Sequence, residues 1–477
     1  MWHNIVGVMS LETSSAERAS LEREKGWVRK ELLRLALPAM GENTLQMVFG
    51  MADTAFLGHL SWKAMSGVGM ANQILFVIQV VLVALSTGVT VTVANAIGTK
   101  DKKIVRTIVW NSVITSVMVG LLLMALSLFS DVFVNVFRGV DPEMRTHATN
   151  YLRVILLGSL GLSLMTTLSS ALRGAGDTKT PMLVATFSNL LNILLDYAMI
   201  FGKLGFPRME TRGAALATVI SRFLGSFVLG FVVFKRRDVG LLEKFEPLRA
   251  KSLKEIFRVG IPSALENLAF SVGILIFANI LLIAGPQVYA GHRVGINVES
   301  LSFMPAFGIA VAITTLVGQR NGEGKREELL MVVREGFKLS LAFQVSVGLF
   351  VFCFPELLIK IFTNDPAIIK LAVLPVRLVG LFQVFPAVET AMNGALRGTG
   401  NTSSLMMFTF LAMWLVRLPV AFILVKYFNL GLLGAWIGMI VDMAVRSSLK
   451  TAYFLSGRWE RVALETRKRV REIGEQT

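Results

Sequence analysis

The long uncharged stretches of this chain constrain its fold more than any other sequence feature. Residues 64–99 and 107–130 contain no Asp, Glu, Lys or Arg, and each exceeds the roughly 20 residues that a helix needs to cross about 30 Å of hydrocarbon. The composition agrees, since 54% of the residues are hydrophobic, 17% are charged and the mean hydropathy is +0.63. Because a membrane-spanning segment must satisfy its own backbone hydrogen bonds, we predict an all-α polytopic membrane protein.

Similar apolar stretches recur along the chain and predict twelve transmembrane helices. The first six are expected at residues 31–59, 65–97, 106–130, 145–171, 181–203 and 213–235. The other six are expected at residues 255–283, 289–318, 331–354, 367–393, 403–426 and 431–456.

The chain also contains two copies of one unit. Residues 30–43 match residues 254–267 at an offset of 224 residues, and a Leu-Arg-Gly-x-Gly segment recurs at the same offset at 172–176 and 396–400. We interpret both Leu-Arg-Gly-x-Gly segments as tight turns between helices. Because six helices per copy is an even number, both copies enter the membrane from the same side. This predicts two six-helix lobes related by a pseudo-twofold axis along the membrane normal, an arrangement typical of transporters that rock two halves.

The distribution of charge predicts how the chain is threaded. The net charge is +16, but the basic residues fall mainly between the apolar stretches, as the positive-inside rule describes. We therefore predict a multi-pass protein of the cell membrane with both termini cytoplasmic, and we attribute the charge to anionic lipid headgroups rather than to nucleic acid. The expected parts are an N-terminal tail (1–30), a first lobe (31–235), a linker (236–254), a second lobe (255–456) and a basic C-terminal tail (457–477).

Polar side chains within the first predicted helix lie on one face. Glu42, Gln46, Phe49 and Asp53 are spaced by four, three and four residues, which aligns them along a helix. Ionisable groups at bilayer depth are costly and are functional candidates by default. Pro38 precedes this face and permits a bend, static or moving. We assign Pro38, Glu42 and Gln46 to a substrate cavity or to helix bending.

A second polar face lies on the fifth predicted helix. Asn189, Asn192 and Asp196 are spaced by three and four residues, so they can face the stripe that contains Asp53. We assign Asn189 to the cavity, although helix packing also explains it. A carboxylate buried beside amides suits proton binding and release, while its oxygens and the Thr218 hydroxyl would also suit a sodium ion. The sequence leaves both coupling ions open; it predicts no firm metal site and no organic cofactor.

The second half carries acids at different positions. Glu266, Glu299 and Glu389 fall in the seventh, eighth and tenth predicted helices and form a possible second-lobe polar site. The alternative is that such acids are neutralised by basic residues such as Arg417 of the eleventh helix. Asp53 has an apolar counterpart in the second copy, so we place the coupling site in the first lobe.

The ordered motifs resemble the multidrug and toxic compound extrusion (MATE) family, and its DinF-like prokaryotic branch in particular. They are the early Leu-Pro of the first helix, the segment 52–60, both Leu-Arg-Gly-x-Gly-x-Thr segments, Asn192-x-x-x-Asp196 and the segment 213–218. The resemblance implies a V-shaped pair of lobes that exports cationic or amphipathic drugs against an inward proton or sodium gradient. It also implies cation binding at Asp53, Asn192 and Asp196, with Thr218 nearby and sodium as one option.

Two other functions compete with an antiporter of this kind. A flippase for lipid-linked precursors would need a strongly cationic cavity, and the obvious cations within the spans are Arg153, Arg377 and Arg417. A membrane-embedded enzyme would need paired catalytic His or Cys residues within the bilayer, which the sequence lacks. We therefore expect a transporter that acts on small organic substrates, in contact with membrane lipids, and that works as a monomer.

Overall fold

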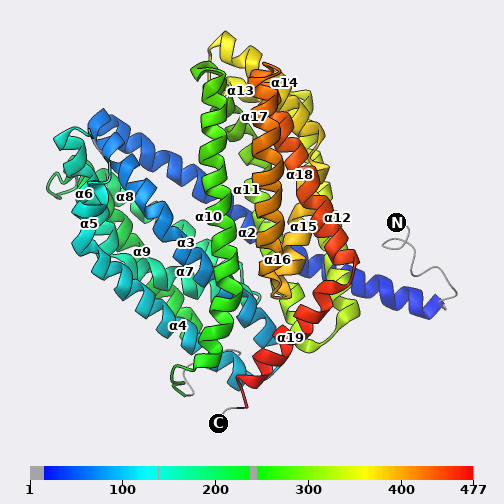
Figure 1. Cartoon of the computed structure of the whole chain (residues 1–477). Coiled ribbons are helices and arrows are strands. Elements are labelled where there is room, and N and C mark those ends of the chain that lie inside the picture. Colours follow the sequence, from blue (N-terminus) through cyan, green and yellow to red (C-terminus); the bar gives the residue numbers. More distant parts are fainter. Residues whose placement is uncertain (1–14, 138, 237–243, 476–477) are drawn as a thin grey trace.

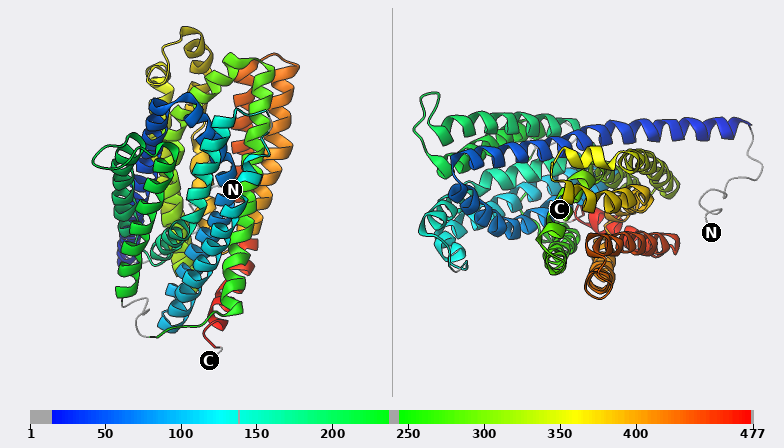
Figure 2. Two further views of the ribbon diagram at one scale, coloured as in Figure 1. Left: turned by 90° about the vertical axis from the view of Figure 1, so that its left-hand side faces the viewer. Right: turned by 90° about the horizontal axis from the view of Figure 1, so that it is seen from above.

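The computed structural model describes residues 15–137, 139–236 and 244–475, and helices are its regular elements. Within the first helix, only the backbone is described for residues 15–21, 51–55 and 57–59. Two groups of helices diverge toward one end of the molecule and meet at the other, so that the protein has the outline of a V (Figure 1). The view from above shows α2 extending along both groups (Figure 2).

The first half of the chain forms one arm of the V. Its elements are α2 (Ser15–Leu60), α3 (Trp62–Gly98), α4 (Lys102–Ala125), the 3-10 turn η1 (Leu126–Phe129), α5 (Ser130–Val134), α6 (Pro142–Leu157), α7 (Ser159–Gly174), α8 (Lys179–Phe201) and α9 (Glu210–Lys235). We call the packed helices α3 to α9, with the outer part of α2, the first bundle.

The second half forms the other arm. Its elements are α10 (Ala250–Ile283), α11 (Pro286–Glu323), α12 (Arg326–Cys353), α13 (Pro355–Lys360), α14 (Pro366–Leu381), α15 (Val384–Gly398), α16 (Thr402–Ala412), the π-helical turn η2 (Met413–Arg417), α17 (Leu418–Lys426), α18 (Gly431–Leu455) and α19 (Arg458–Glu472). We call α11 to α18, with the outer part of α10, the second bundle.

The helices confirm an all-helical membrane protein. Among the described residues, nine helices are long and apolar enough to span a membrane, and two bent pairs raise this number to eleven. The predicted spans 145–171 and 367–393 are these bent pairs, α6 with α7 and α14 with α15, and both are bent by 54°. The remaining predicted span, 31–59, lies within α2, which is not among the eleven.

The first helix of each half crosses to the other half at the narrow end of the V. In α2, Leu32 and Ala36 belong to the core of the second half, while the outer part of the helix lines the first bundle. In α10, Ile256 belongs to the core of the first half, and Phe277, further along, belongs to that of the second. The duplication seen in the sequence is thus repeated in the packing.

Reciprocal contacts join the two halves where α3 and α11 meet. Asn95 Nδ2 donates to the Gly398 carbonyl at 3.0 Å, and Gln319 Nε2 donates to the Gly174 carbonyl at 3.1 Å. Each residue of the first contact lies 224 positions from its counterpart in the second. The backbones approach closely here, because a Cβ added at Gly322 would collide with the Asn95 carbonyl group.

The close approach makes a testable prediction about stability. Gly322→Ala should lower the free energy of unfolding by about 1–3 kcal/mol, since the added methyl group must push two helix backbones apart. Gly230→Ala is the matched control, because a Cβ there would have its nearest neighbour, Leu168 Cδ1, at an ordinary 3.8 Å. Thermal unfolding in detergent measures both variants, and equal unfolding temperatures would contradict the prediction.

The C-terminal helix α19 lies across the narrow end and contacts both halves. Trp459 and Ala463 pack into the core of the second half, while Val470 packs into that of the first. Arg469 forms an ion pair with Glu255 of α10 at 2.7 Å. The helix therefore ties the bundles together at the end where they meet.

Candidate functional site

The first bundle contains a cavity of about 410 Å³ between α2, α7, α8 and α9. Its lining combines charged, amide, hydroxyl and apolar side chains: Glu42, Gln46, Phe49, Leu162, Met165, Thr166, Ser169, Arg173, Ala185, Asn189 and Arg222, with Gly50. A volume of this size suits a small organic molecule, and such sites are mostly apolar with a few polar groups that fix orientation.

The helical spacing of α2 explains why its polar residues share the cavity. Glu42, Gln46 and Phe49 lie on one face of a continuous helix and all line the cavity, and Asn189 of α8 lines it as well. Pro38 lies one turn before Glu42 in the same helix. The structure thus brings together the residues that the sequence assigned to a cavity, with Pro38 beside them along α2.

Glu42 forms an ion pair with Arg173, an arginine whose sequence motif predicts only a turn. The carboxylate is buried and Arg173 Nη2 lies 2.5 Å from its Oε1. The equivalent pair in the second half, Arg397 and Glu266, has the same spacing along the chain and lies at 2.9 Å. The turn interpretation was therefore incomplete. The signal was present in the sequence, because both members of the pair recur at the offset of the duplication.

Three of the four predicted coupling residues lie together. Asn192 and Asp196 of α8 are buried, Asp196 being only 2% exposed, and Asn192 Nδ2 lies 3.4 Å from Thr218 Oγ1 of α9. Their amide, carboxylate and hydroxyl oxygens are the ligand types that a sodium ion prefers. Asp53, the fourth residue, lies in α2 but among the side chains that the structure does not describe.

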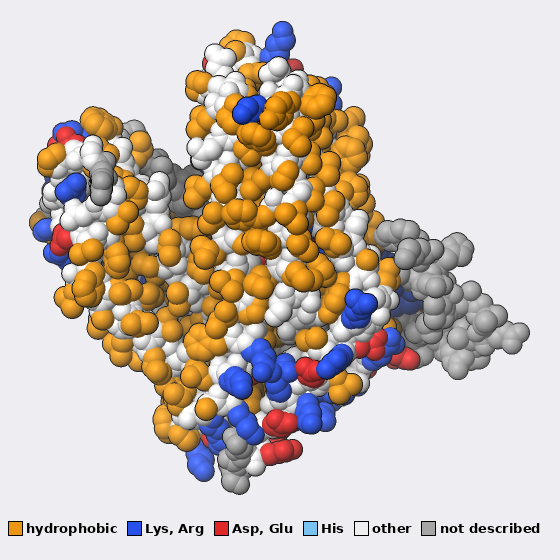
Figure 3. Space-filling view, viewed as in Figure 1, with side chains coloured by type: hydrophobic (Ala, Val, Ile, Leu, Met, Phe, Trp, Pro, Cys, Tyr) orange, Lys and Arg blue, Asp and Glu red, His pale blue; other side chains and the backbone are white. Residues whose placement is uncertain are grey.

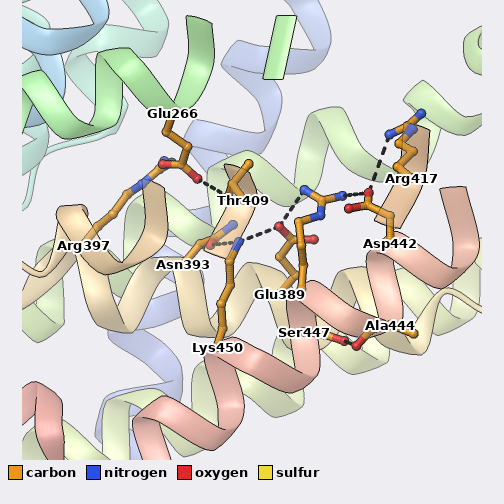
Figure 4. A network of polar contacts seen from close by, with 11 residues as sticks. Glu266, Glu389, Asn393, Arg397, Thr409, Arg417, Asp442, Ala444, Ser447 and Lys450 are labelled. Atoms are coloured by element: carbon orange, nitrogen blue, oxygen red, sulfur yellow. Dashed lines mark hydrogen bonds and ion pairs between the residues drawn. The ribbon is translucent and has the colours of Figure 1, made fainter. Parts of the chain in front are cut away.

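The second bundle contains a network of buried charges (Figure 4). Glu389 of α15 accepts from Lys450 Nζ at 2.7 Å and from Arg446 Nη1 at 3.0 Å, both from α18. Lys450 also donates to Asn393 at 2.9 Å and is fully buried. Two cations of α18 therefore neutralise the Glu389 carboxylate.

The same network continues to the π-helical turn. Arg446 Nη2 lies 3.0 Å from Asp442 Oδ2, and Arg417 Nη1 lies 3.8 Å from the same oxygen. Arg417 also stacks over the ring of Phe277 at 4.5 Å. Single π turns within helices often mark functional sites, and this one ends at Arg417.

The remaining acids of the second half have contrasting surroundings. Glu266 is paired with Arg397 and also accepts from Thr409 Oγ1 at 2.8 Å. Glu299 of α11 is 8% exposed, and within the part of the chain that the structure describes it forms no hydrogen bond or ion pair. Glu266, Glu299 and Glu389 therefore have different local environments.

Several cations within the spans were not predicted from the sequence. Besides Arg417, the structure places Arg446 and Lys450 in α18 and Arg222 near the middle of α9. Arg153, by contrast, is 46% exposed and paired with Asp131 at 2.5 Å. The missed residues could have been found by scanning each predicted span for basic as well as acidic side chains.

Comparison with known proteins gives consistent matches along the chain. A family model described as MatE matches residues 38–198 and 262–423. A probable multidrug resistance protein NorM of Thermotoga maritima is 61% identical over 94% of this chain and 96% of its own length. The uncharacterized transporter YisQ of Bacillus subtilis is 28% identical over 90% of this chain and 94% of its own.

Solved structures share the fold as well. A multidrug resistance MATE family transporter of the MOP superfamily, in an outward-facing conformation, has a TM-score of 0.82 and 26% identity, covering 95% of this chain and 99% of that one. A MATE protein in complex with MaD3S has a TM-score of 0.83 and 26% identity, covering 92% of this chain and 97% of that one.

Proposed function

The chain belongs to the MATE family of membrane transporters, and from this premise we propose that it exports organic cations and toxic amphipathic compounds in exchange for protons or sodium ions that flow inward. It is a multidrug efflux transporter of the NorM type. The observation that carries the proposed exchange is the cavity of the first bundle, whose lining residues Asn189 and Arg222 lie one helical turn from Asn192 of α8 and Thr218 of α9.

Coupling in this proposal takes place in the first bundle. Asp196 binds the proton or sodium ion together with Asn192, Thr218 and Asp53, and Glu42, Gln46 and Asn189 contact the substrate. Since α8 contributes both Asn189 to the cavity and Asp196 to the coupling group, ion binding can bias the position of a helix that also touches the substrate. A ligand shifts a conformational equilibrium only by its differential affinity for the two states. In this proposal, an ion bound at the coupling group and a substrate bound in the cavity favour different conformations of the transporter.

The charge distribution supports the predicted orientation in the membrane. Basic side chains gather at the narrow end of the V in the space-filling view, and the upper arms carry fewer of them (Figure 3). By the positive-inside rule, the narrow end with α19 faces the cytoplasm and both termini are cytoplasmic. The V then opens away from the cytoplasm, as an exporter in its releasing state requires. We also propose that one chain is the working unit.

Particular residues bear on two further points, the branch of the family to which the chain belongs and the alternative function as a flippase. The DinF-like branch is supported by the buried pair Asn192 and Asp196. The alternative function, a lipid-linked precursor flippase, is supported by Arg173 and Arg222, two basic residues that line the cavity. The antiporter is favoured because Glu42 already neutralises Arg173. The paired acids Glu266 and Glu389 of the second bundle have a structural role in this proposal.

Transport by purified protein in liposomes tests the proposal. We expect Asp196→Asn to reduce the uptake of a fluorescent organic cation driven by an imposed proton or sodium gradient by at least about tenfold, because the neutral amide cannot exchange the coupling ion. Asp53→Asn should behave alike. Asp131→Asn is the matched control, since Asp131 is an exposed acid of the same bundle, and it should transport as the parent does. If Asp53→Asn and Asp196→Asn both transport the dye as the parent does under each gradient, coupling in the first bundle is refuted.

A further inference from the structure

The exposed face of α10 changes abruptly from basic to apolar. Lys251, Lys254 and Arg258 are all exposed and are spaced by three and four residues, so they form one stripe along the helix. Ile261 and Leu265 continue the same face and are 49% and 46% exposed. Such a change marks the level at which a membrane helix passes from the hydrocarbon into the headgroup layer.

The C-terminal helix α19 lies beside this stripe. Its Arg469 forms an ion pair with Glu255 of α10 at 2.7 Å, which joins the two helices. The side of α19 that faces away from the core is exposed at Arg458, Lys468 and Arg471. Basic side chains gather at the narrow end, where the lower part of α10 and α19 lie (Figures 1 and 3).

The exposed cations of the two helices form one surface, which we call the α10–α19 basic surface. It consists of Lys251, Lys254, Arg258, Arg458, Lys468 and Arg471. None of the six forms an ion pair with a described residue, whereas Arg461, the other exposed arginine of α19, is paired with Glu465 at 3.2 Å. Leu464 is 58% exposed on the same side of α19. Cations without protein partners beside an exposed apolar side chain are typical of a helix that binds an anionic membrane surface.

Both helices of this surface cross between the two halves of the protein. Ile256 of α10 and Val470 of α19 belong to the core of the first half, while Trp459 of α19 belongs to that of the second. Asn321 of α11 donates to Asn95 Oδ1 of α3 at 2.8 Å and to the Ala463 carbonyl of α19 at 3.0 Å. A ligand that bridges α10 and α19 therefore binds across the seam that must open when the narrow end separates.

We propose that the α10–α19 basic surface binds the phosphate groups of anionic phospholipids, and that the bound lipids stabilise the closed narrow end. This inference goes beyond the proposed transport function, because it involves neither the substrate nor the coupling ion. The lysines and arginines bind the phosphate oxygens by charge-assisted hydrogen bonds, and Leu464 contacts the acyl chains. The lipid composition of the membrane would thereby set how readily the two halves separate.

Thermal unfolding of the full-length protein in detergent, titrated with dioleoylphosphatidylglycerol, tests the binding. We expect this lipid to raise the unfolding temperature of the parent more than phosphatidylcholine does. The variant Lys251→Gln, Lys254→Gln, Arg258→Gln should need at least about tenfold more phosphatidylglycerol for the same rise, while Lys251→Arg, Lys254→Arg, Arg258→Lys keeps the response. The matched control is Lys360→Gln, Lys370→Gln, Lys426→Gln, which removes three exposed lysines at the open end of the second bundle and should respond as the parent does.

Three outcomes would overturn the lipid site: an equal rise with phosphatidylcholine, an equal rise with inorganic phosphate alone, or an unchanged response in the Gln variant of α10. If that variant unfolds early without lipid, the single variants Lys254→Gln and Lys468→Gln replace it. Each should then weaken the response to phosphatidylglycerol, and a parent-like response in both overturns the site.

Spin labels across the seam test the effect on the narrow end. Lys102 and Lys325 are exposed residues of opposite halves, near the contact of Lys100 with Glu323 at 4.0 Å. With both changed to Cys in a Cys353→Ser background, electron paramagnetic resonance measures their separation in nanodiscs. We expect a larger short-distance population in phosphatidylglycerol than in phosphatidylcholine, and no such difference once the α10 stripe is changed to Gln. Identical distance distributions of the parent stripe in both lipids would overturn the stabilisation of the closed end.

Discussion

Asp442→Ala is expected to destabilise the protein by about 3–5 kcal/mol, the range for breaking a buried ion pair from one side. Asp442 is fully buried in α18 and faces both Arg446 and Arg417, at 3.0 and 3.8 Å. Arg446 keeps Glu389 as a partner after the substitution, but Arg417, itself 2% exposed, loses the carboxylate it faces. Thermal unfolding in detergent should show a large drop in the unfolding temperature.

A second substitution tests whether the uncompensated charge is the cause. Arg417→Met removes that charge and keeps a soft apolar side chain against Phe277, over which Arg417 now stacks. The double variant Asp442→Ala with Arg417→Met should therefore be more stable than Asp442→Ala alone, a coupling that a double-mutant cycle measures. An Asp442→Ala protein that unfolds at the temperature of the parent would show that the network contributes little to stability.

We expect the second large effect when either of two equivalent ion pairs is broken, Arg173 with Glu42 or Arg397 with Glu266. Arg173→Gln and Arg397→Gln each leave a buried carboxylate without its arginine, which should cost about 2 kcal/mol of stability in either case. Only Arg173 and Glu42 line the cavity, so only Arg173→Gln should also weaken binding of a fluorescent substrate. Each variant is the control for the other, because the two arginines occupy equivalent positions of the duplication.

Unfolding temperatures and dye binding of the two variants are compared side by side. Matching losses of stability with a binding defect in Arg173→Gln alone is the expected pattern. Equal binding defects in both variants would mean that the two ion pairs affect substrate binding indirectly, through the overall structure of the protein, rather than by direct contact with the substrate.

The architecture could be predicted from the sequence because the length of each apolar stretch and the repeat of a motif can be read directly along the chain. Eleven of the twelve predicted spans correspond to candidate spans, and the family match falls into two segments that begin 224 residues apart, at 38 and 262. The bends within the spans at 145–171 and 367–393 were not predicted, since apolar runs on both sides of Gly158 give one continuous hydropathy signal. Such a bend depends on packing, here of Gly158 against Val219.

The polar groups were predicted less completely because their partners are distant in sequence. The face of Glu42, Gln46 and Phe49 follows from helical spacing alone, and all three line one cavity. The arginine that holds Glu42 lies 131 residues away, so spacing within a helix could not reveal it. Arg222 was overlooked because one basic residue barely changes the hydropathy of a 26-residue helix.

The reciprocal contacts between the two halves have a consequence for the ancestry of the protein. Asn95 reaches the Gly398 carbonyl as Gln319 reaches the Gly174 carbonyl, so each half presents the same patch to the other, as identical subunits do in a two-fold symmetric dimer. A half-length precursor with these residues would have met a second copy of itself in parallel orientation through this patch. Fusion of two such copies into one chain would make the partner permanent. With each half then encoded separately, Arg222 could arise in one half while Lys450 and Arg446 arose beside an acid in the other.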